Sequence, residues 1–332
     1  MERAVLRGRP FLSRAGEGAD RVAPMFDQTT SDAFQAKIAE KLEGFPPPPP
    51  WHPVSEGLWG SVYDLGDGTV LKLTRRHGGL GSGESKIIRE AAALRLLDDF
   101  SGPRLRVPKL VGHGLWDDPW GFGSSYSGPP LAGWLRCERM PGRHMEEAGF
   151  FGRASSERDR FGEDLGAAIA DFHRLTAALV PEAAKLGDSL MRSLGEAMTR
   201  ISGAEQRRKL EALKEVWRRD APQPVFLHGD LNLSNVLEDR RSGIAFIDFA
   251  EAGIGAPEAD LRHFENAGPL RDAVFRGYAA ASGAMPNMPR YRLAVAVNAA
   301  VSLAIGGESG HPREGLRRRQ WLDEALAQAG LD

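Results

Sequence analysis

The amino-acid sequence predicts an α+β protein in which a small β-rich lobe precedes a larger, mainly helical lobe. The chain has 332 residues, more than one domain of ordinary size requires. Runs of alternating polarity, which are typical of strands, are concentrated in the first part of the chain, and apolar residues at helical spacing dominate afterwards. We therefore expect two lobes, residues 31–138 and 139–332, behind a disordered tail at residues 1–30.

The expected tail contains five arginines before residue 24 but no continuous apolar segment. A secretory signal needs such a segment, so none is predicted. Glu2, Glu17 and Asp20 also argue against a transit peptide, which is poor in acidic residues. Met25 is a second candidate start of the native product.

The small lobe is expected to begin with a helix over residues 31–43, where Phe34, Ile38 and Leu42 recur on one face. The proline run at 46–50 ends this helix, because proline removes backbone donors and fixes an extended conformation.

A hairpin is predicted next, since strands at 62–65 and 69–73 flank the turn Gly66-Asp67-Gly68. After a glycine-rich connector, residues 86–97 carry the apolar stripe of a helix. Further strands are expected at 107–111 and 134–137.

The large lobe is predicted to contain several amphipathic helices and one strand-rich island at residues 225–249. The helices are expected at 161–175, 206–218, 269–281 and 291–305.

Composition excludes several classes of function. Lys and Arg number 43 against 45 Asp and Glu, a net charge of −2, so no excess of positive charge favours nucleic acid as a partner. The single cysteine, Cys137, excludes an intramolecular disulfide framework and agrees with a reducing cytoplasm. The longest apolar stretch, residues 293–305, is too short to cross a membrane.

The clearest chemical signal is the segment His228-Gly229-Asp230, followed by Asn235-Val236-Leu237 and by Ile247-Asp248-Phe249. A turn at 240–243 would bring Asp248 back beside Asn235. Two carboxylates and an amide oxygen would then share one pocket, and hard oxygen ligands of this kind suit Mg²⁺.

Phosphoryl transfer of the kinase type needs the same groups: a carboxylate at the attacking hydroxyl, and an Asn and an Asp that hold the metal on the phosphates. The alternative is an ordinary surface loop rich in Asp and Asn. The complete constellation directly after the apolar run Val225-Phe226-Leu227 argues against that alternative.

These motifs resemble the aminoglycoside phosphotransferase family, which shares the bilobal protein-kinase-like fold. The resemblance covers about residues 54–261. It implies that Asp230 is the catalytic base, that Asn235 and Asp248 hold the metal, and that the cofactors are ATP and Mg²⁺, with GTP not excluded.

The resemblance also implies supporting roles. His228 matches the scaffolding histidine of the loop, and Asp260 matches a buried aspartate that braces it. The family has Gly-Asp-Pro where this chain has Gly255-Ala256-Pro257, which puts one local support contact in doubt.

In the small lobe, the family order implies an ion pair between Lys72 and Glu90 that holds the lysine on the α- and β-phosphates. The alternative is a strand lysine and a solvated helix glutamate without a shared role. The segment Arg106 to Gly114, which follows in the family order, argues for the ion pair.

Four residues are predicted to bind the nucleotide through the main chain. Gly60 and Ser61 would cover the phosphates, although the three spaced glycines of protein kinases are missing. The carbonyl of Glu138 and the N–H of Met140 lie at the position of the interlobe hinge, where the base is read. The Gly81-Ser82-Gly83 stretch follows the lysine strand and is expected to be only a connector.

The acceptor is expected to be a small molecule, because only eleven residues separate Asp248 from Asp260 and a peptide platform would not fit. A polycationic aminoglycoside would call for an acidic cleft. Residues 178–220 and 261–332 each carry nine Lys and Arg against seven Asp and Glu, which favours a less cationic hydroxylated acceptor.

Three arginines are predicted to lie near the 228–235 loop, namely Arg262, Arg271 and Arg276. In the competing arrangement these point to solvent, and Glu251, Glu265 and Asp272 form the cleft wall.

Two alternative functions remain open, an aminoglycoside phosphotransferase proper and a nucleotide-binding regulator without turnover. His173 is expected to be a helix-packing histidine. The sequence does not fix the oligomeric state.

Overall fold

The structure is a computed structural model of the 332-residue chain. It describes residues 28–42, 49–77, 80–118, 130–145, 150–219, 222–239, 241, 243–306 and 312–331. The expected tail up to residue 27 and most of the proline run lie outside these ranges. Within them, no helix combines the length and apolarity that a bilayer crossing requires.

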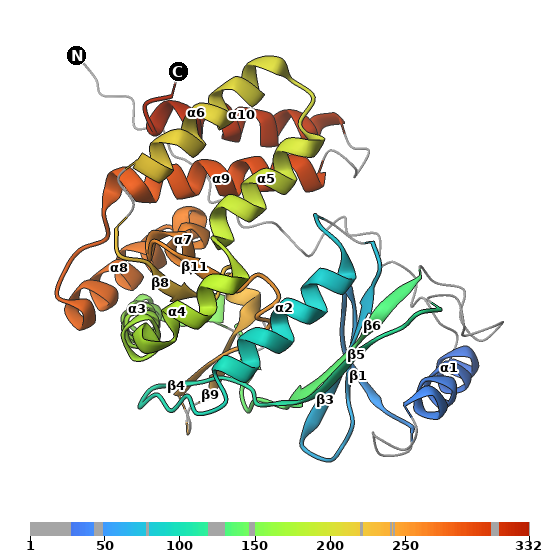
Figure 1. The fold of residues 1–332 in the computed structure, drawn as a ribbon. Helices are drawn as coiled ribbons and strands as arrows, with labels where there is room; N and C mark the ends of the chain where they lie inside the picture. The colour runs from blue at the N-terminus through green and yellow to red at the C-terminus, as the bar shows by residue number, and fades with distance from the viewer. Residues whose placement is uncertain are drawn as a thin grey trace.

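The small lobe is built on a five-stranded antiparallel sheet of order β1-β2-β3-β6-β5 (Figure 1). Its strands are β1 His52–Gly57, β2 Gly60–Asp64, β3 Thr69–Arg75, β5 Leu110–Leu115 and β6 Leu131–Glu138. The predicted hairpin is confirmed, since β2 pairs with β3 and both Gly66 and Gly68 have positive φ. Strand β1 was not predicted.

Two helices flank this sheet (Figure 1). Helix α1, Gln28–Lys41, begins inside the segment expected to be tail, and Phe34, Ile38 and Leu42 are buried as predicted. They join a cluster with sheet residues such as Leu71. Helix α2, Gly83–Leu96, begins after Ser82, whose hydroxyl accepts a hydrogen bond from the Ser85 amide at 3.2 Å.

The large lobe is mainly helical, as predicted. Its longer helices are α3 Ser155–Leu175, α5 Ser189–Arg200, α6 Ala204–Arg219, α8 Pro269–Ser282, α9 Met288–Gly306 and α10 Pro312–Gln328. The short helices α4 Val180–Ala183 and α7 Glu258–Leu261 lie between them. The sequence did not predict α5 and α10, nor the short helices α4 and α7.

Short strands carry the central loops of the large lobe. Strand β8, Val225–Leu227, pairs with β11, Gly253–Gly255. Strands β9 Val236–Asp239 and β10 Gly243–Phe246 form the expected hairpin, with β7 Arg143–His144 on its outer edge. On the other edge β4, Leu105–Arg106, pairs in parallel with β10. Residues counted with the small lobe therefore contribute a strand to the large lobe.

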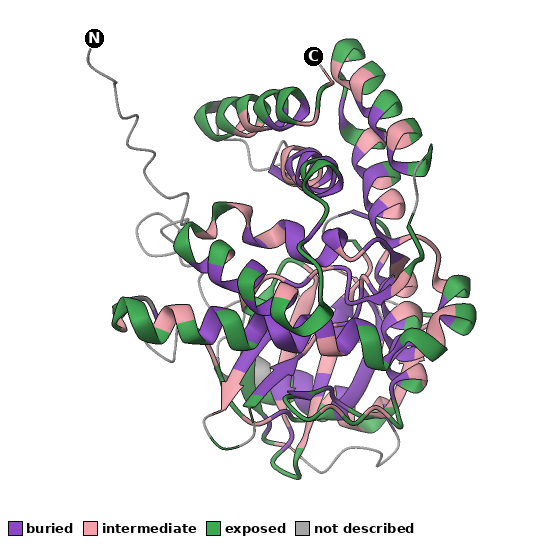
Figure 2. Ribbon diagram, turned by 90° about the vertical axis from the view of Figure 1, so that its left-hand side faces the viewer, coloured by how far each residue is buried: buried purple, intermediate pink, exposed green. Residues whose placement is uncertain are grey.

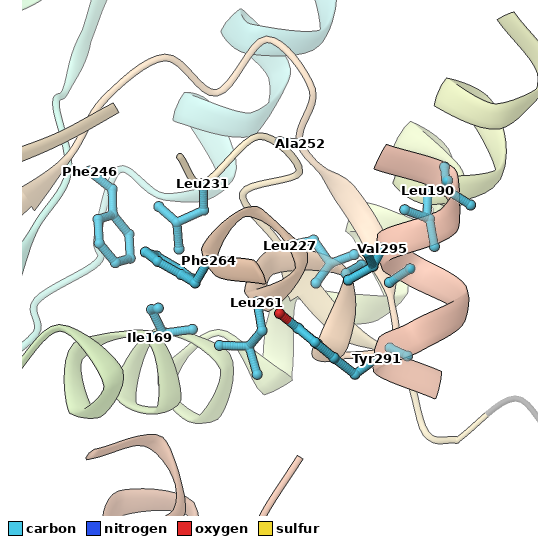
Figure 3. Packing of buried hydrophobic residues seen from close by; sticks show 14 of the residues in the cluster. Ile169, Leu190, Leu227, Leu231, Phe246, Ala252, Leu261, Phe264, Tyr291 and Val295 are labelled. Carbon is cyan, nitrogen blue, oxygen red and sulfur yellow. The ribbon is translucent and has the colours of Figure 1, made fainter. Parts of the chain in front are cut away.

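The main hydrophobic core lies beneath the 228–235 loop (Figure 3). Leu231 from this loop is fully buried together with Phe246 at the end of β10 and with Ile169 of α3. Phe264 and Leu261 close the cluster from the side of α7. Figure 2 shows the burial of the described residues, with buried residues on the strands and on the inner faces of the helices. The packing fixes the loop from below, while Asp230 lines the cavity.

Candidate active site

A cavity of about 160 Å³ lies between the two lobes. Lys72 and Glu90 line it from the small lobe, and Asp230, Asp248 and His263 line it from the large lobe. The structure therefore brings the expected base, one expected metal ligand and the expected ion pair into one place.

The 228–235 loop is attached to the core through Asp260. The carboxylate of Asp260 accepts hydrogen bonds from the main-chain N–H groups of His228 at 3.0 Å and Gly229 at 2.8 Å. It also contacts His173 Nε2 at 3.1 Å. Burial alone would raise the pKa of Asp260, but His173 and these donors outweigh it and the pKa is lowered. His173 thus does more than fill space, because it helps to hold this carboxylate charged.

His228 is fully buried and serves as scaffolding. Its Nε2 lies 2.8 Å from the carbonyl oxygen of Ile247, and its Nδ1 accepts from the main-chain N–H of Asp230 at 3.3 Å. The ring therefore joins the Asp230 loop to the strand that leads to Asp248.

Gly229 occupies a position that only glycine fills without strain. Its φ is 87°, and an added Cβ would lie 2.0 Å from the carbonyl oxygen of Glu251. The close approach allows the chain to turn directly before Asp230, so that this side chain enters the cavity.

The side chain of Asp230 stands between two nitrogen atoms. Asn235 Nδ2 lies 3.3 Å from Asp230 Oδ2 and donates to the Asp230 carbonyl oxygen at 2.8 Å. On the other side, His263 Nε2 is 3.5 Å from Asp230 Oδ1. Partial loss of hydration raises the pKa of Asp230, Arg262 acts against this shift, and Asp248 adds to it. A raised pKa suits a carboxylate that has to accept a proton.

Asn235 and Asp248 approach each other as the hairpin prediction requires. The main-chain N–H of Ile247 donates to the carbonyl oxygen of Asn235 at 3.0 Å, and Phe246 pairs with Val236. Asp248 has a φ of 65°, a left-handed conformation that is uncommon for a residue with a side chain. Such outliers cluster at functional sites.

Lys72 forms the predicted ion pair and a second one. Its Nζ lies 2.8 Å from Glu90 Oε2 and 2.7 Å from Asp248 Oδ1. Burial would lower the pKa of Lys72, but Asp248 and Glu90 outweigh it and the pKa is raised, so the ammonium stays charged. Burial raises the pKa of Glu90, whereas Lys72 lowers that of Asp248 against the effect of burial. The three side chains connect both lobes.

A second charged group lies next to this one and was not predicted as a unit. We call it the Glu251 cluster: Glu251 with Lys86, Arg89 and Arg192. Lys86 also lies over the ring of Trp59 at 4.3 Å from its centroid. The cluster ties the segment after Asp248 to helix α2 on one side and to helix α5 on the other.

The expected phosphate-binding residues lie in β2. Gly60 pairs with Thr74 and Ser61 with Leu73 of β3. An added Cβ at Gly60 would lie 1.8 Å from the Leu73 carbonyl oxygen, which explains the glycine. It is Trp59, from the turn before Gly60, that lines the cavity.

The expected hinge follows β6. Glu138 ends this strand and is exposed, whereas Met140 is buried against Leu237 and Ala245. Within the described part of the chain, the Met140 N–H has no hydrogen-bond partner. Neither Glu138 nor Met140 lines the cavity.

Two of the three arginines do not line the cavity. Arg271 pairs with Glu265 and Asp272, and Arg276 pairs with Glu163.

Arg262 does line the cavity. Its guanidinium donates to the carbonyl oxygens of Gly229, at 2.7 Å, and Ala259. Of the acidic residues proposed as an alternative wall, only Glu251 lines the cavity. The helical periodicity did not reveal these local pairings.

Among the residues that line the cavity without having been predicted as site residues are two titratable ones, Glu196 of α5 and His263. His263 follows Asp260 by three residues in a helical stretch, and this spacing places both side chains on the same side. That spacing was the available signal. Nothing local marks Glu196, because its place depends on how α5 packs.

The bilobal arrangement, with one polar cavity between a five-stranded sheet and a helical lobe, is a protein-kinase-like fold, and solved structures agree. The gentamicin complex of APH(2")-IIa is 15% identical with a TM-score of 0.57, over 90% of this chain and 98% of that chain. A ternary complex of APH(4)-Ia with AMP-PNP and hygromycin B is 14% identical with a TM-score of 0.56, over 89% and 98%. The GDP and kanamycin complex of APH(2")-IIIa is 17% identical with a TM-score of 0.54, over 84% and 93%.

The sequence profile of the phosphotransferase enzyme family, APH, matches residues 50–294. This chain belongs to that family. No curated protein matches the chain by sequence.

Proposed function

We propose that this protein transfers the γ-phosphoryl group of ATP to a hydroxyl group of a small molecule, with Asp230 as the base. The observation that carries the proposal is the shared cavity, in which Asp230, Asp248 and the Lys72–Glu90 ion pair face one another. Phosphoryl transfer depends on positioning and charge stabilisation, and these are the groups that it uses.

The oxygen atoms near the loop fit a magnesium ion. The Asn235 amide nitrogen is turned to the Asp230 carbonyl, which leaves the amide oxygen for a ligand, and Asp248 Oδ2 takes no part in the contact with Lys72. Among the described residues, no group of three or more His, Cys, Asp or Glu side chains forms a metal cluster. One carboxylate, one amide and the substrate phosphates are a usual Mg²⁺ site. Asn235 and Asp248 would hold the ion, which supplies positive charge to the phosphates.

In the proposed reaction, the acceptor hydroxyl gives its proton to Asp230 while its oxygen forms a bond to the γ-phosphorus. The bond from that phosphorus to the β–γ bridging oxygen breaks, and ADP leaves. Lys72, kept charged by Glu90, would bind the α- and β-phosphates. Asp260 and His228 would hold the loop that carries the base.

The nucleotide is proposed to enter along the edge of the sheet. Its base would contact the carbonyl of Glu138 and the N–H of Met140, and its phosphates would lie below Gly60 and Ser61. The buried Met140 side chain, beside Leu237, supports an apolar floor for the base. ATP is the proposed donor, GTP is the alternative to test, and the cytoplasm is the proposed location.

The acceptor is proposed to be neutral or weakly charged. Around Glu251, the cations Lys86, Arg89 and Arg192 face one carboxylate. The cavity lining as a whole carries five carboxylates against three cations, but Glu90, Asp248 and Glu251 are already paired with Lys72 or Lys86. Only Asp230 and Glu196 remain, so an acceptor with several ammonium groups finds a small excess of negative charge there. This supports a less cationic acceptor over a polycationic aminoglycoside.

The direct test incubates purified protein with ATP, Mg²⁺ and a panel of hydroxylated compounds, and measures ADP release. The panel includes neutral compounds, compounds with one amine, and kanamycin-like and hygromycin-like polycations at low and high salt. We expect turnover with a neutral or weakly charged compound, and turnover lowered by about 10²- to 10⁴-fold in Asp230→Asn. Micromolar KM values for the polycations that rise steeply with salt would overturn the acceptor proposal. Absence of ADP release with ATP and with GTP across the panel would overturn the proposed reaction.

A further inference from the structure

His263 lies on the helical turn η6, Arg262–Ala267, directly beside Asp230. Its side chain is only 10% exposed, and Nε2 has no hydrogen-bond partner within the described residues. That nitrogen lies 3.5 Å from Asp230 Oδ1. A buried ring nitrogen without a partner is costly, so its position calls for an explanation.

In the other two histidines near the loop, both ring nitrogen atoms have a partner. His173 contacts Asp260 at one ring nitrogen and the Tyr278 hydroxyl at the other. His228 likewise uses both ring nitrogens. His263 differs because its Nε2 lacks such a partner and lies 3.5 Å from the carboxylate of the proposed base.

The protonation of His263 follows from its surroundings. Burial lowers its pKa well below 6.5, and the neighbouring Arg262 lowers it further, while Asp260 acts in the opposite direction. The ring is therefore neutral at pH 7 and carries one proton. A bare lone pair at Nε2 would repel the carboxylate oxygen, whereas an N–H is attracted to it. The proton therefore belongs on Nε2.

The two oxygen atoms of Asp230 would then each face one N–H group. Asn235 Nδ2 faces Oδ2 at 3.3 Å, and His263 Nε2 faces Oδ1 at 3.5 Å. The backbone of the loop is fixed by Asp260, but the Asp230 side chain is 41% exposed and has room to rotate. Two donors on opposite sides would fix the plane of the carboxylate.

We propose that His263 is a positioning residue for Asp230, whose Nε2–H donates to Oδ1 and, together with Asn235, aims the carboxylate at the acceptor hydroxyl. This inference rests on the proposed function, in which Asp230 takes the hydroxyl proton. His263 does not bind the acceptor through Nε2, because that atom is buried. A neutral donor orients the base and lowers its proton affinity less than a cation would.

Three variants of one position separate positioning from packing. His263→Gln keeps an N–H donor near the place of Nε2, His263→Asn places its amide near Nδ1, and His263→Leu removes the donor. With the acceptor found in the panel, we expect His263→Leu to lower kcat on the order of 10- to 100-fold and to leave KM for ATP unchanged. His263→Gln should recover most of kcat, and His263→Asn should not. Unchanged kcat in His263→Leu, or equal recovery by Asn and Gln, would overturn the proposal.

A second measurement does not depend on the reaction. In protein labelled with ¹⁵N-histidine, the long-range ¹H–¹⁵N spectrum at pH 7 distinguishes the two neutral tautomers from the imidazolium, and His263→Gln identifies the resonance. We expect the neutral Nε2–H form in wild type and a shift toward Nδ1–H in Asp230→Ala. An imidazolium or an Nδ1–H tautomer in wild type would overturn the proposal. A wild-type protein without any turnover would instead remove the proposed function, and the spectrum would then decide the hydrogen bond alone.

Discussion

The two walls of the cavity are held by different kinds of contact. On the large-lobe wall, Asp260 and Arg262 bind main-chain N–H and C=O groups of the 228–235 loop in the buried interior. On the small-lobe wall, Lys72 and Lys86 reach across the cavity to Asp248 and Glu251 through side chains. The first wall is preformed in the absence of ligand. The second consists of ion pairs that a nucleotide and its metal would exchange for contacts of their own.

The largest effect is expected at the base itself. Asp230→Asn should lower kcat by about 10²- to 10⁴-fold and leave ATP affinity nearly unchanged, because the carboxylate faces the acceptor hydroxyl and not the nucleotide. Steady-state kinetics and calorimetric titration with ATP measure the two quantities. Asp164→Asn, an exposed position of α3, is the matched control. Near-normal turnover by Asp230→Asn would remove the residue from this role.

The next effect tests the preformed wall. Asp260→Asn should lower the free energy of unfolding by about 3 kcal/mol. The substitution replaces one of the two buried carboxylate oxygens, each of which accepts from a main-chain N–H group, by an NH₂ group that can only donate. The loss should depend on pH. The folded pKa of Asp260 lies below its ordinary 3.8, so its contribution is present above that value and is lost as the pH falls through the folded pKa.

Urea unfolding of wild type and Asp260→Asn between pH 7 and the acid range would show this behaviour. The difference between the two proteins should be constant at neutral pH and should shrink in acid. A difference that grows in acid would contradict the charged state assigned to Asp260.

A smaller effect is expected across the cavity at Asp248. Asp248→Ala should abolish the tightening of ATP binding by Mg²⁺, since this carboxylate is proposed to hold the metal on the phosphates. Calorimetry with ATP in the presence of Mg²⁺ or of a chelator measures the tightening in each protein. Equal Mg·ATP affinity in both would refute the metal assignment. Asp248 has a positive φ, which Asn tolerates better than Ala does. Asp248→Asn is therefore a useful companion variant.

The smallest effect is expected for Lys86. Lys86→Met removes one partner of Glu251, but Arg89 and Arg192 remain within reach of that carboxylate. The free energy of unfolding should therefore change by about 1 kcal/mol or less, against several for a buried charge left alone. Chemical denaturation measures it, with Lys37→Met at an exposed ion pair as the control. A loss as large as that of Asp260→Asn would show that both walls are held equally firmly.

The sequence predicted the part of the site that lies in one continuous stretch. The loop, the β9–β10 hairpin and Asp248 occupy residues 228–248, and a local turn is enough to bring their side chains together. The ion pair of Lys72 with Glu90 was predicted from the order of motifs along the chain in the family, and the structure contains it. The main helices of the large lobe were found because their apolar residues recur with the helical period.

The features of the site that the sequence did not predict depend on contacts between elements that are distant along the chain. Glu251 meets Lys86 and Arg192 only because α2 and α5 pack on either side of it. Arg271 and Arg276 find acidic partners on the surface, which no count of charges along the chain reveals. Strand β1 was not predicted because its sequence contains Pro53 and shows little alternation of apolar and polar residues.

The pairing of β4 with β10 has a mechanical consequence. Besides the ion pairs of Lys72 and Lys86, the small lobe is joined to the large lobe by the connection after Glu138 and by the hydrogen-bonded ladder of Leu105 with Ile244. Once ligands have replaced those ion pairs, these two attachments leave one easy rotation, about the line through both. We therefore expect the cavity to widen by rotation of the lobes about that line.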